Sequence, residues 1–126
     1  MRIYLASPLF TPEERTHVKE VAYTLRKKGH RVYVPMEHEI KNAWEISNAK
    51  WGERVFDEDI KAIRNCDKVV AIYYGLYSDS GTAWEMGFAY GIGKPVEVIN
   101  VAGQKISLMI ANSIEGDPFD PWQEQT

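Results

Sequence analysis

The stretch Lys68–Tyr74, KVVAIYY, decides the fold of this chain. Its β-branched and aromatic residues, uninterrupted by glycine or proline, are typical of a buried β-strand. A turn-rich segment, Gly75–Gly81, follows it, and the apolar segment Thr82–Ile92 then predicts a helix. Another strand, Val96–Val101, comes next. A strand, a helix and a second strand in this order form the unit from which parallel sheets are built.

The same alternation of strands and helices extends outward from this unit. Thr11, Pro12 and Glu14 match a capping box, which marks the start of a helix. The remaining predicted elements are the strand Arg2–Ala6, the helix between Thr11 and Gly29, the strand Arg31–Pro35, a looser stretch Glu37–Lys50, the helix Gly52–Asn65 and a short helix Ile106–Ala111. This order predicts an α/β fold with a parallel sheet and helices on both faces.

The length of 126 residues fits one domain, and neither a linker nor a repeat interrupts it. We therefore expect a single domain over residues 1–126. Ligands in open parallel sheets bind at the carboxyl ends of the strands. The loops expected at that end are Ser7–Phe10, Met36–Glu39 and Tyr74–Gly81.

The composition excludes several classes of function. Lysine and arginine number 15 against 18 acidic residues, and no basic run exceeds Arg26–Lys28, so we expect no nucleic-acid partner. No run of 18 apolar residues occurs, so we expect no membrane partner. The single cysteine, Cys66, excludes an internal disulfide and favours a reducing compartment. We expect a cytoplasmic protein.

Motifs for metals, nucleotide phosphates and thiol nucleophiles are also lacking. The histidines, His17, His30 and His38, have no metal-ligand spacing with one another or with Cys66. No phosphate-binding GxxxxGK[ST] loop is present. Cys66 precedes the strand 68–74, at the end opposite the expected crevice, which argues against a nucleophilic role. We expect neither a metal nor a cofactor.

The most informative single residue is Glu85. It is the only charged residue between Ser80 and Gly93, in a helix that is apolar on nearly every side and is therefore expected to be buried. A buried carboxylate without partners is costly. Its expected place in the first helical turn, near free N–H groups, would favour the anion. The alternative is an ordinary helix cap.

Three further residues carry chemistry on this reasoning. Asp59 lies four residues from both Val55 and Ile63, in the middle of the expected core-facing stripe of its helix; the alternative is a structural acid that pairs with a lysine or a backbone N–H. Asp79 directly precedes the helix of Glu85, where an aspartate is also a common cap. Tyr4 lies inside the first strand, either as packing or as a phenol that needs a partner.

Several carboxylates in an apolar crevice suit glycosyl chemistry. One ionised carboxylate attacks or shields an oxocarbenium-like centre, and another, whose pKa is raised by burial, transfers the proton of the leaving group. Flat aromatic side chains suit a heterocyclic base. The aromatic residues expected along the crevice are Phe10, Trp51 and Trp84.

Two blocks of this sequence resemble the nucleoside 2-deoxyribosyltransferase family. They are Ile3–Phe10, IYLASPLF, and the more specific Asp79–Gly87, DSGTAWEMG, with Asp59 between them. The resemblance extends over nearly the whole chain and implies a flavodoxin-like, doubly wound parallel sheet. It implies an enzyme that transfers a 2-deoxyribosyl group between nucleobases through a covalent glycosyl–glutamate intermediate, in nucleoside salvage.

The resemblance also implies the roles of individual residues. Glu85 matches the nucleophile, Tyr4 the phenol that positions it, and Asp59 the acid that protonates the departing base. The positions implied to bind substrate are Asp79 beside the 5′-hydroxyl, Phe10 and Trp51 at the base, Gly81 within the specific block, and Ser107. The implied partners are a deoxynucleoside, a free nucleobase and further copies of this chain, as a dimer or hexamer that buries Ile106–Asn112.

Ser107 departs from the family pattern, because transferases usually carry an asparagine there. A serine is similar to the related 2′-deoxynucleoside 5′-phosphate N-hydrolases. Against that reading, those hydrolases have a small hydroxyl residue in place of Asp79 and a phosphate-binding loop in place of Pro8-Leu9-Phe10. The alternatives that stay open are an N-hydrolase and a non-catalytic nucleoside or nucleotide sensor.

Overall fold

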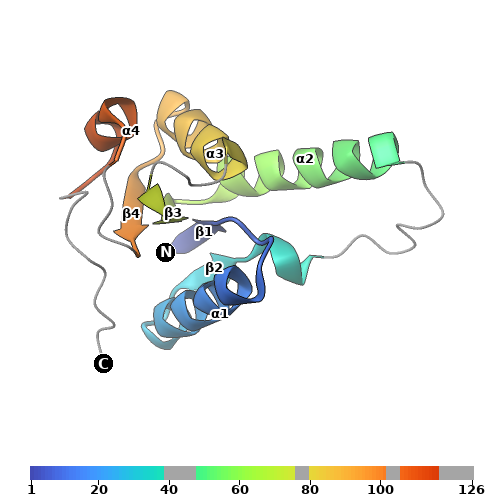
Figure 1. Ribbon diagram of the computed structural model, residues 1–126, viewed down its shortest axis with the longest axis horizontal. Coiled ribbons are helices and arrows are strands. Elements are labelled where there is room, and N and C mark those ends of the chain that lie inside the picture. Colours follow the sequence, from blue (N-terminus) through green and yellow to red (C-terminus); the bar gives the residue numbers. More distant parts are fainter. Residues whose placement is uncertain (39–47, 76–79, 102–105, 117–126) are drawn as a thin grey trace.

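The computed structural model describes residues 1–38, 48–75, 80–101 and 106–116 of the chain. Strands and helices alternate through these ranges, as the sequence predicts (Figure 1). The elements are β1 (Arg2–Ala6), α1 (Pro12–Lys27), β2 (Arg31–Tyr33), the 3-10 turn η1 (Pro35–Glu37), α2 (Asn48–Asn65), β3 (Lys68–Tyr73), α3 (Ser80–Gly91), β4 (Val96–Asn100) and α4 (Leu108–Ser113).

The strands form one sheet in the order β2-β1-β3-β4, and every neighbouring pair is parallel. The chain starts at β1, adds β2 on one side and then crosses to β3 on the other. This is the doubly wound arrangement of flavodoxin-like folds, whose ligands bind where the strand order reverses. The predicted fold class, a single-domain α/β fold with a flavodoxin-like parallel sheet, is confirmed.

Helices cover both faces of the sheet. Figure 1 shows α1 on one face, and α2, α3 and α4 on the other. Successive residues of a strand point to opposite faces, so Ile3 and Leu5 join the core under α1, whereas Tyr4 and Ala6 join the core under α2 and α3. The same strand thus supplies two different environments.

The start of α1 follows the predicted capping box. The Thr11 hydroxyl accepts a hydrogen bond from the Glu14 backbone N–H at 3.1 Å, and the Glu14 carboxylate accepts from the Thr11 N–H at 2.9 Å. The helix ends just before Gly29, whose φ of +95° is a conformation that glycine adopts without strain.

Several element boundaries differ from the prediction. The short helix predicted at Ile106–Ala111, for example, is observed as α4 at Leu108–Ser113. The strand β2 ends at Tyr33 rather than Pro35, because Pro35 lacks an N–H and begins η1. The helix α2 begins at Asn48 instead of Gly52. Since α3 begins at Ser80 rather than Thr82, Glu85 lies in the second turn, and the predicted first-turn position was wrong.

The helix α3 is less buried than its apolar sequence predicts. Thr82, Met86 and Ala89 face the sheet and are buried, whereas Trp84 and Tyr90 are exposed. The reason is that α3 packs on the sheet between α2 and α4, while its outward side is left uncovered within the described chain. Among these residues, no helix is both long and apolar enough to cross a bilayer.

Candidate active site

A direct contact joins Tyr4 of β1 and Glu85 of α3. The Tyr4 hydroxyl donates a hydrogen bond to the Glu85 Oε2 atom. Tyr4 is fully buried in the core under α2 and α3, and Glu85 is partly buried. The alternation of β1 turns Tyr4 toward this face, and the second turn of α3 brings the carboxylate above it. Residues 81 positions apart in sequence thereby form one polar unit.

The environment keeps the Tyr4 phenol protonated. Burial raises the pKa of Tyr4 far above its usual range, and the negative charges of Glu85 and Asp59 raise it further. A protonated phenol carries no charge, so it donates a hydrogen bond to a carboxylate without electrostatic repulsion. A hydrogen bond to an ionised acceptor is stronger than one between neutral groups. Tyr4 therefore stabilises the ionised form of Glu85.

Asp59 of α2 is the second acid of the site. It is partly buried, and among the described residues it has no hydrogen-bond or ion-pair partner. Burial raises its pKa to about 6, the neighbouring Glu58 carboxylate adds to the rise, and His38 opposes it. The negative charge of Asp59 in turn raises the pKa of Tyr4. A carboxyl group with such a pKa can give and take a proton near neutral pH.

Two aromatic residues that the sequence reasoning did not single out lie beside this pair. The Tyr33 ring stacks on the Tyr4 ring with centroids 5.6 Å apart. The His38 ring stacks in turn on the Tyr33 ring, with centroids 4.1 Å apart. The signal that could have found Tyr33 is its register: it lies directly opposite Tyr4 on the adjacent strand.

The remaining predicted site residues are more scattered. Phe10 follows β1 with 76% of its side chain exposed, and Trp51 is exposed on α2, whose N-terminal part extends beyond the sheet (Figure 1). Gly81 is exposed in the first turn of α3. Ser107 caps α4 by accepting a hydrogen bond from the Ile110 N–H at 3.3 Å. Asp79 lies outside the described residues.

Trp84, the third aromatic residue expected along the crevice, packs against aromatic residues of α2 and α3. Its ring stacks on Phe88 with centroids 5.5 Å apart and meets the edge of Phe56 at 5.4 Å. These contacts link the outer surfaces of α2 and α3, so Trp84 serves packing between the two helices.

A cavity of about 570 Å³ opens between α2 and the strands β1 and β2. Tyr33, His38 and Glu58 line it on one side, and Arg2 and Arg31, the first residues of their strands, line it on another. Neither Tyr4 nor Glu85 is part of its lining. The cavity therefore reaches Tyr33 and His38, the aromatic neighbours of Tyr4, from the side of the sheet where the strands begin. It does not open onto Glu85.

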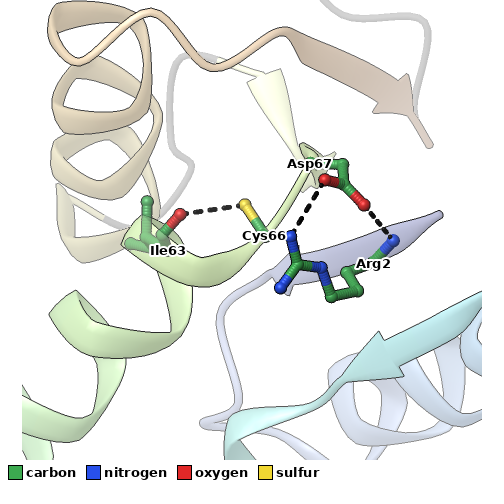
Figure 2. Close-up of polar contacts among 4 residues, drawn as sticks. All are labelled: Arg2, Ile63, Cys66 and Asp67. Atoms are coloured by element: carbon green, nitrogen blue, oxygen red, sulfur yellow. Dashed lines mark hydrogen bonds and ion pairs between the residues drawn. The ribbon is translucent and has the colours of Figure 1, made fainter.

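Cys66 is a buried structural residue. Its Sγ–H donates to the Ile63 carbonyl oxygen at 3.0 Å, and burial raises the pKa of the thiol (Figure 2). A protonated, buried thiol is a poor nucleophile. The neighbouring Asp67 pairs with Arg2 at the start of β1 (Figure 2). Among the described residues, no group of three or more histidine, cysteine or acidic side chains could hold a metal ion.

Comparison with known proteins identifies the family. The family model for nucleoside 2-deoxyribosyltransferase matches residues 3–119. A 2-deoxyribosyltransferase from Bacillus psychrosaccharolyticus is 38% identical, with a TM-score of 0.81 over 90% of this chain and 82% of that chain. No curated protein sequence matches the chain.

Two other solved structures share the fold at lower identity. A conserved protein from Enterococcus faecalis V583 is 26% identical, with a TM-score of 0.66 over 94% of this chain and 79% of its own. A CMP N-glycosidase from Clostridium botulinum is 21% identical, with a TM-score of 0.64 over 90% and 80%, a likeness of fold alone. On the family model and the 38% identity, this chain belongs to the nucleoside 2-deoxyribosyltransferase family.

Proposed function

We propose that the protein transfers a 2-deoxyribosyl group from one nucleobase to another through a covalent intermediate on Glu85. The observation that carries the proposal is the hydrogen bond from Tyr4 to the Glu85 carboxylate, with Asp59, whose pKa is raised to about 6, acting by its charge on the same phenol. A carboxylate held ionised and an acid held partly protonated are the two groups that glycosyl transfer requires.

The reaction has two balanced steps. A Glu85 oxygen attacks C1′ of the deoxynucleoside, the glycosidic C1′–N bond breaks with its electron pair on the base, and Asp59 gives the base a proton. An incoming base then attacks C1′, the bond from C1′ to Glu85 breaks, and the proton of the new base returns to Asp59. The two half-reactions predict ping-pong kinetics. Exchange of bases between deoxynucleosides is a salvage reaction. We place the protein in the cytoplasm, and the free, buried Cys66 is compatible with that reducing compartment.

One incubation separates this reaction from its alternatives. The protein is given deoxyinosine with and without free adenine, and the products are followed by chromatography. A transferase forms deoxyadenosine when adenine is present. An N-hydrolase releases hypoxanthine and deoxyribose whether or not adenine is added, because water takes the place of the second base. Recovery of unchanged deoxyinosine in both samples would contradict the proposal and favour a binding protein.

We further propose that the substrate is a nucleoside rather than a nucleotide. The resemblance puts Asp79 beside the 5′-position, where a hydroxyl group can donate to a carboxylate. A phosphate within ~5 Å of that carboxylate would cost about 3 kcal/mol per unit charge at an effective dielectric of 20. The loop Ser7-Pro8-Leu9-Phe10 contains no basic residue, and the Arg15 guanidinium beside it donates to the Leu9 and Phe10 carbonyl oxygens. Faster cleavage of deoxynucleoside monophosphates than of deoxynucleosides would overturn this assignment.

The active form that we propose is a homo-oligomer, at least a dimer, that buries the segment from Ile106 to Asn112. Its support is the exposure of Leu108 and Met109 on α4, which are 81% and 83% accessible in the single chain. Apolar side chains this exposed lose contact with water when a second copy covers them. Sedimentation at the assay concentration tests the proposal, and a fully active monomer would contradict it.

A further inference from the structure

Three rings stand in a continuous stack that ends at Glu85. His38 follows η1, Tyr33 ends β2 and Tyr4 lies in β1, so each ring comes from a different element. The interplanar angles are 7° between His38 and Tyr33 and 14° between Tyr33 and Tyr4. We call these three residues the ring column. At its inner end, the Tyr4 hydroxyl donates to Glu85.

The strand register makes Tyr33 the lateral support of Tyr4. The two residues are direct partners in the parallel ladder between β1 and β2, and neighbouring strands lie about 4.8 Å apart. Side chains at partner positions point to the same face of a sheet and pack against each other. A phenyl ring with a neighbour on its flank can tilt in fewer directions, and a phenol held still keeps its hydroxyl directed at one acceptor.

Tyr33 has no competing polar role in the described structure. Among the described residues, its hydroxyl makes no hydrogen bond. Burial raises the pKa of Tyr33 to about 12, and the negative charges of Asp59 and Glu58 on α2 contribute to the rise. The ring therefore stays neutral and stacks as a phenol. His38 covers its outer face and lines the same cavity as Tyr33.

We propose that Tyr33 and His38 are positioning residues, which act through the ring column to hold the Tyr4 phenol on the Glu85 carboxylate. Neither is proposed to touch the reacting atoms. In its effect on turnover this inference rests on the proposed function, because the carboxylate must be the nucleophile for its alignment to matter. Small misplacements of catalytic groups cost large factors in rate.

The first test compares two replacements at position 33. Tyr33→Leu removes the ring and is expected to lower kcat by between about tenfold and a hundredfold. Tyr33→Phe keeps the ring and is expected to retain at least about ten times more kcat than Tyr33→Leu. The matched control is Tyr23→Leu, an exposed tyrosine of α1 on the opposite side of the sheet, for which kcat is expected to stay unchanged. Equal losses for Tyr33→Phe and Tyr33→Leu, or full kcat in Tyr33→Leu, would overturn the proposal.

The outer ring is tested in the same way. His38→Ala is expected to lower kcat by a smaller factor than Tyr33→Leu, because His38 is exposed and contacts Tyr4 only through Tyr33. His38→Phe, which restores a ring without a titratable group, is expected to recover most of that loss. Failure of the phenylalanine to recover kcat would show that the imidazole acts by its charge or protons, against the ring column.

A measurement without substrate separates this inference from the proposed function. In protein with ¹³C-labelled tyrosine, the Tyr4 signal is assigned by its loss in Tyr4→Phe, and its ring-flip rate is measured by nuclear magnetic resonance. The rate is expected to rise in Tyr33→Leu and to stay near the wild-type value in Tyr33→Phe. An unchanged rate in Tyr33→Leu overturns the ring column. If the wild-type protein neither exchanges nor hydrolyses bases, the proposed function fails, and this measurement alone decides the inference.

Discussion

The two faces of the sheet share the same strands but differ in chemistry. Under α1 the core is aliphatic, and Ile3 and Leu5 of β1 pack there with Val18, Val21 and other branched residues. Under α2 and α3 the same strand presents Tyr4, which meets the carboxylate of Glu85 and feels the charge of Asp59. One face is therefore mainly aliphatic, apart from the partly buried contact of 2.6 Å between His17 and Tyr74, and the other holds partly buried acids.

This difference suggests that one face of the sheet mainly stabilises the fold, whereas the other carries the chemistry. Aliphatic burial stabilises a fold without any requirement for partners, whereas partly buried acids weaken it unless their charges are satisfied. The α1 face can therefore stabilise the sheet on which the other face keeps Asp59 with a raised pKa. Substitutions on the two faces should accordingly affect different measurements.

The largest expected effect comes from Glu85→Gln. The amide keeps the size of the side chain but cannot act as a nucleophile, so we expect kcat for base exchange to fall at least about a hundredfold while the fold is retained. Intact-mass spectrometry should show no deoxyribosyl adduct on Glu85→Gln, whereas we expect one on the wild-type protein. Glu20→Gln, an exposed position of α1, is the control. Activity above about one hundredth of wild type would remove Glu85 as the nucleophile.

The second effect is on stability and belongs to the other face. Leu5 is fully buried in the core under α1, and Leu5→Ala should lower the free energy of unfolding by about 3 kcal/mol, from lost burial and a residual cavity. Denaturant titration measures the loss. In conditions where the variant is folded, kcat should stay within about twofold of wild type. A large fall in kcat at unchanged stability would contradict the separation of the two faces.

Tyr4→Phe, one residue away in the same strand, should show the reverse pattern. The ring remains in the core, but Glu85 loses a donor, and a hydrogen bond to a charged group contributes about 1.5–3 kcal/mol. We expect kcat to fall by between about tenfold and a hundredfold, with KM for the deoxynucleoside changed much less. Steady-state kinetics and thermal unfolding of Tyr4→Phe and Leu5→Ala, measured side by side, provide the comparison. Equal kcat in Tyr4→Phe and wild type would exclude the hydrogen bond as a catalytic contribution.

Much of the fold follows from local patterns. The capping box at Thr11 and Glu14 and the apolar run of β3 are signals within a few residues, and both were read correctly. The first residue of α3 was predicted less accurately. The beginning of α3 at Ser80 is two residues earlier than predicted, and because 3.6 residues make a helical turn, that shift moves Glu85 from the first turn to the second.

The candidate site was partly predictable for the same reason. Tyr4, Asp59 and Glu85 stand out because each breaks an apolar pattern, and the structure joins Tyr4 to Glu85. Tyr33 and His38 break no pattern of their own. Their importance comes from the register between β1 and β2 and from the turn η1, which are long-range features that no local window contains.

Asp59→Asn should stabilise the protein in a pH-dependent way. The native pKa of about 6 lies above the ordinary 3.8, so the native state binds more protons than the unfolded state between these values, and stability falls as the pH rises through them. Removing the ionisable group should raise the free energy of unfolding by about 1–2 kcal/mol at pH 8, allowing for partial exposure, and by about half as much at pH 5.

Denaturant titrations at the two pH values measure this effect, and Asp57→Asn supplies a matched control at an exposed position of the same helix. We expect the control to change stability little at either pH. A destabilised Asp59→Asn at pH 8 would mean that the carboxylate is held by favourable partners, and the case for Asp59 as a proton donor would weaken.

The smallest expected effect is at Ser107, where a structural and a functional explanation compete. Its hydroxyl accepts the Ile110 N–H and caps α4, and loss of such a cap costs about 1 kcal/mol. Ser107→Ala should therefore lower the midpoint of thermal unfolding slightly. Ser107→Asp should restore it, because aspartate caps as well as serine and its charge suits a helix N-terminus.

The aspartate would at the same time repel a phosphate group. If deoxynucleoside use survives Ser107→Asp better than Ser107→Ala, the cap accounts for the serine. If instead the wild-type protein cleaves monophosphates and Ser107→Asp abolishes that cleavage, the hydroxyl serves the substrate, and the contrast between a structural α4 and a catalytic α3 no longer holds.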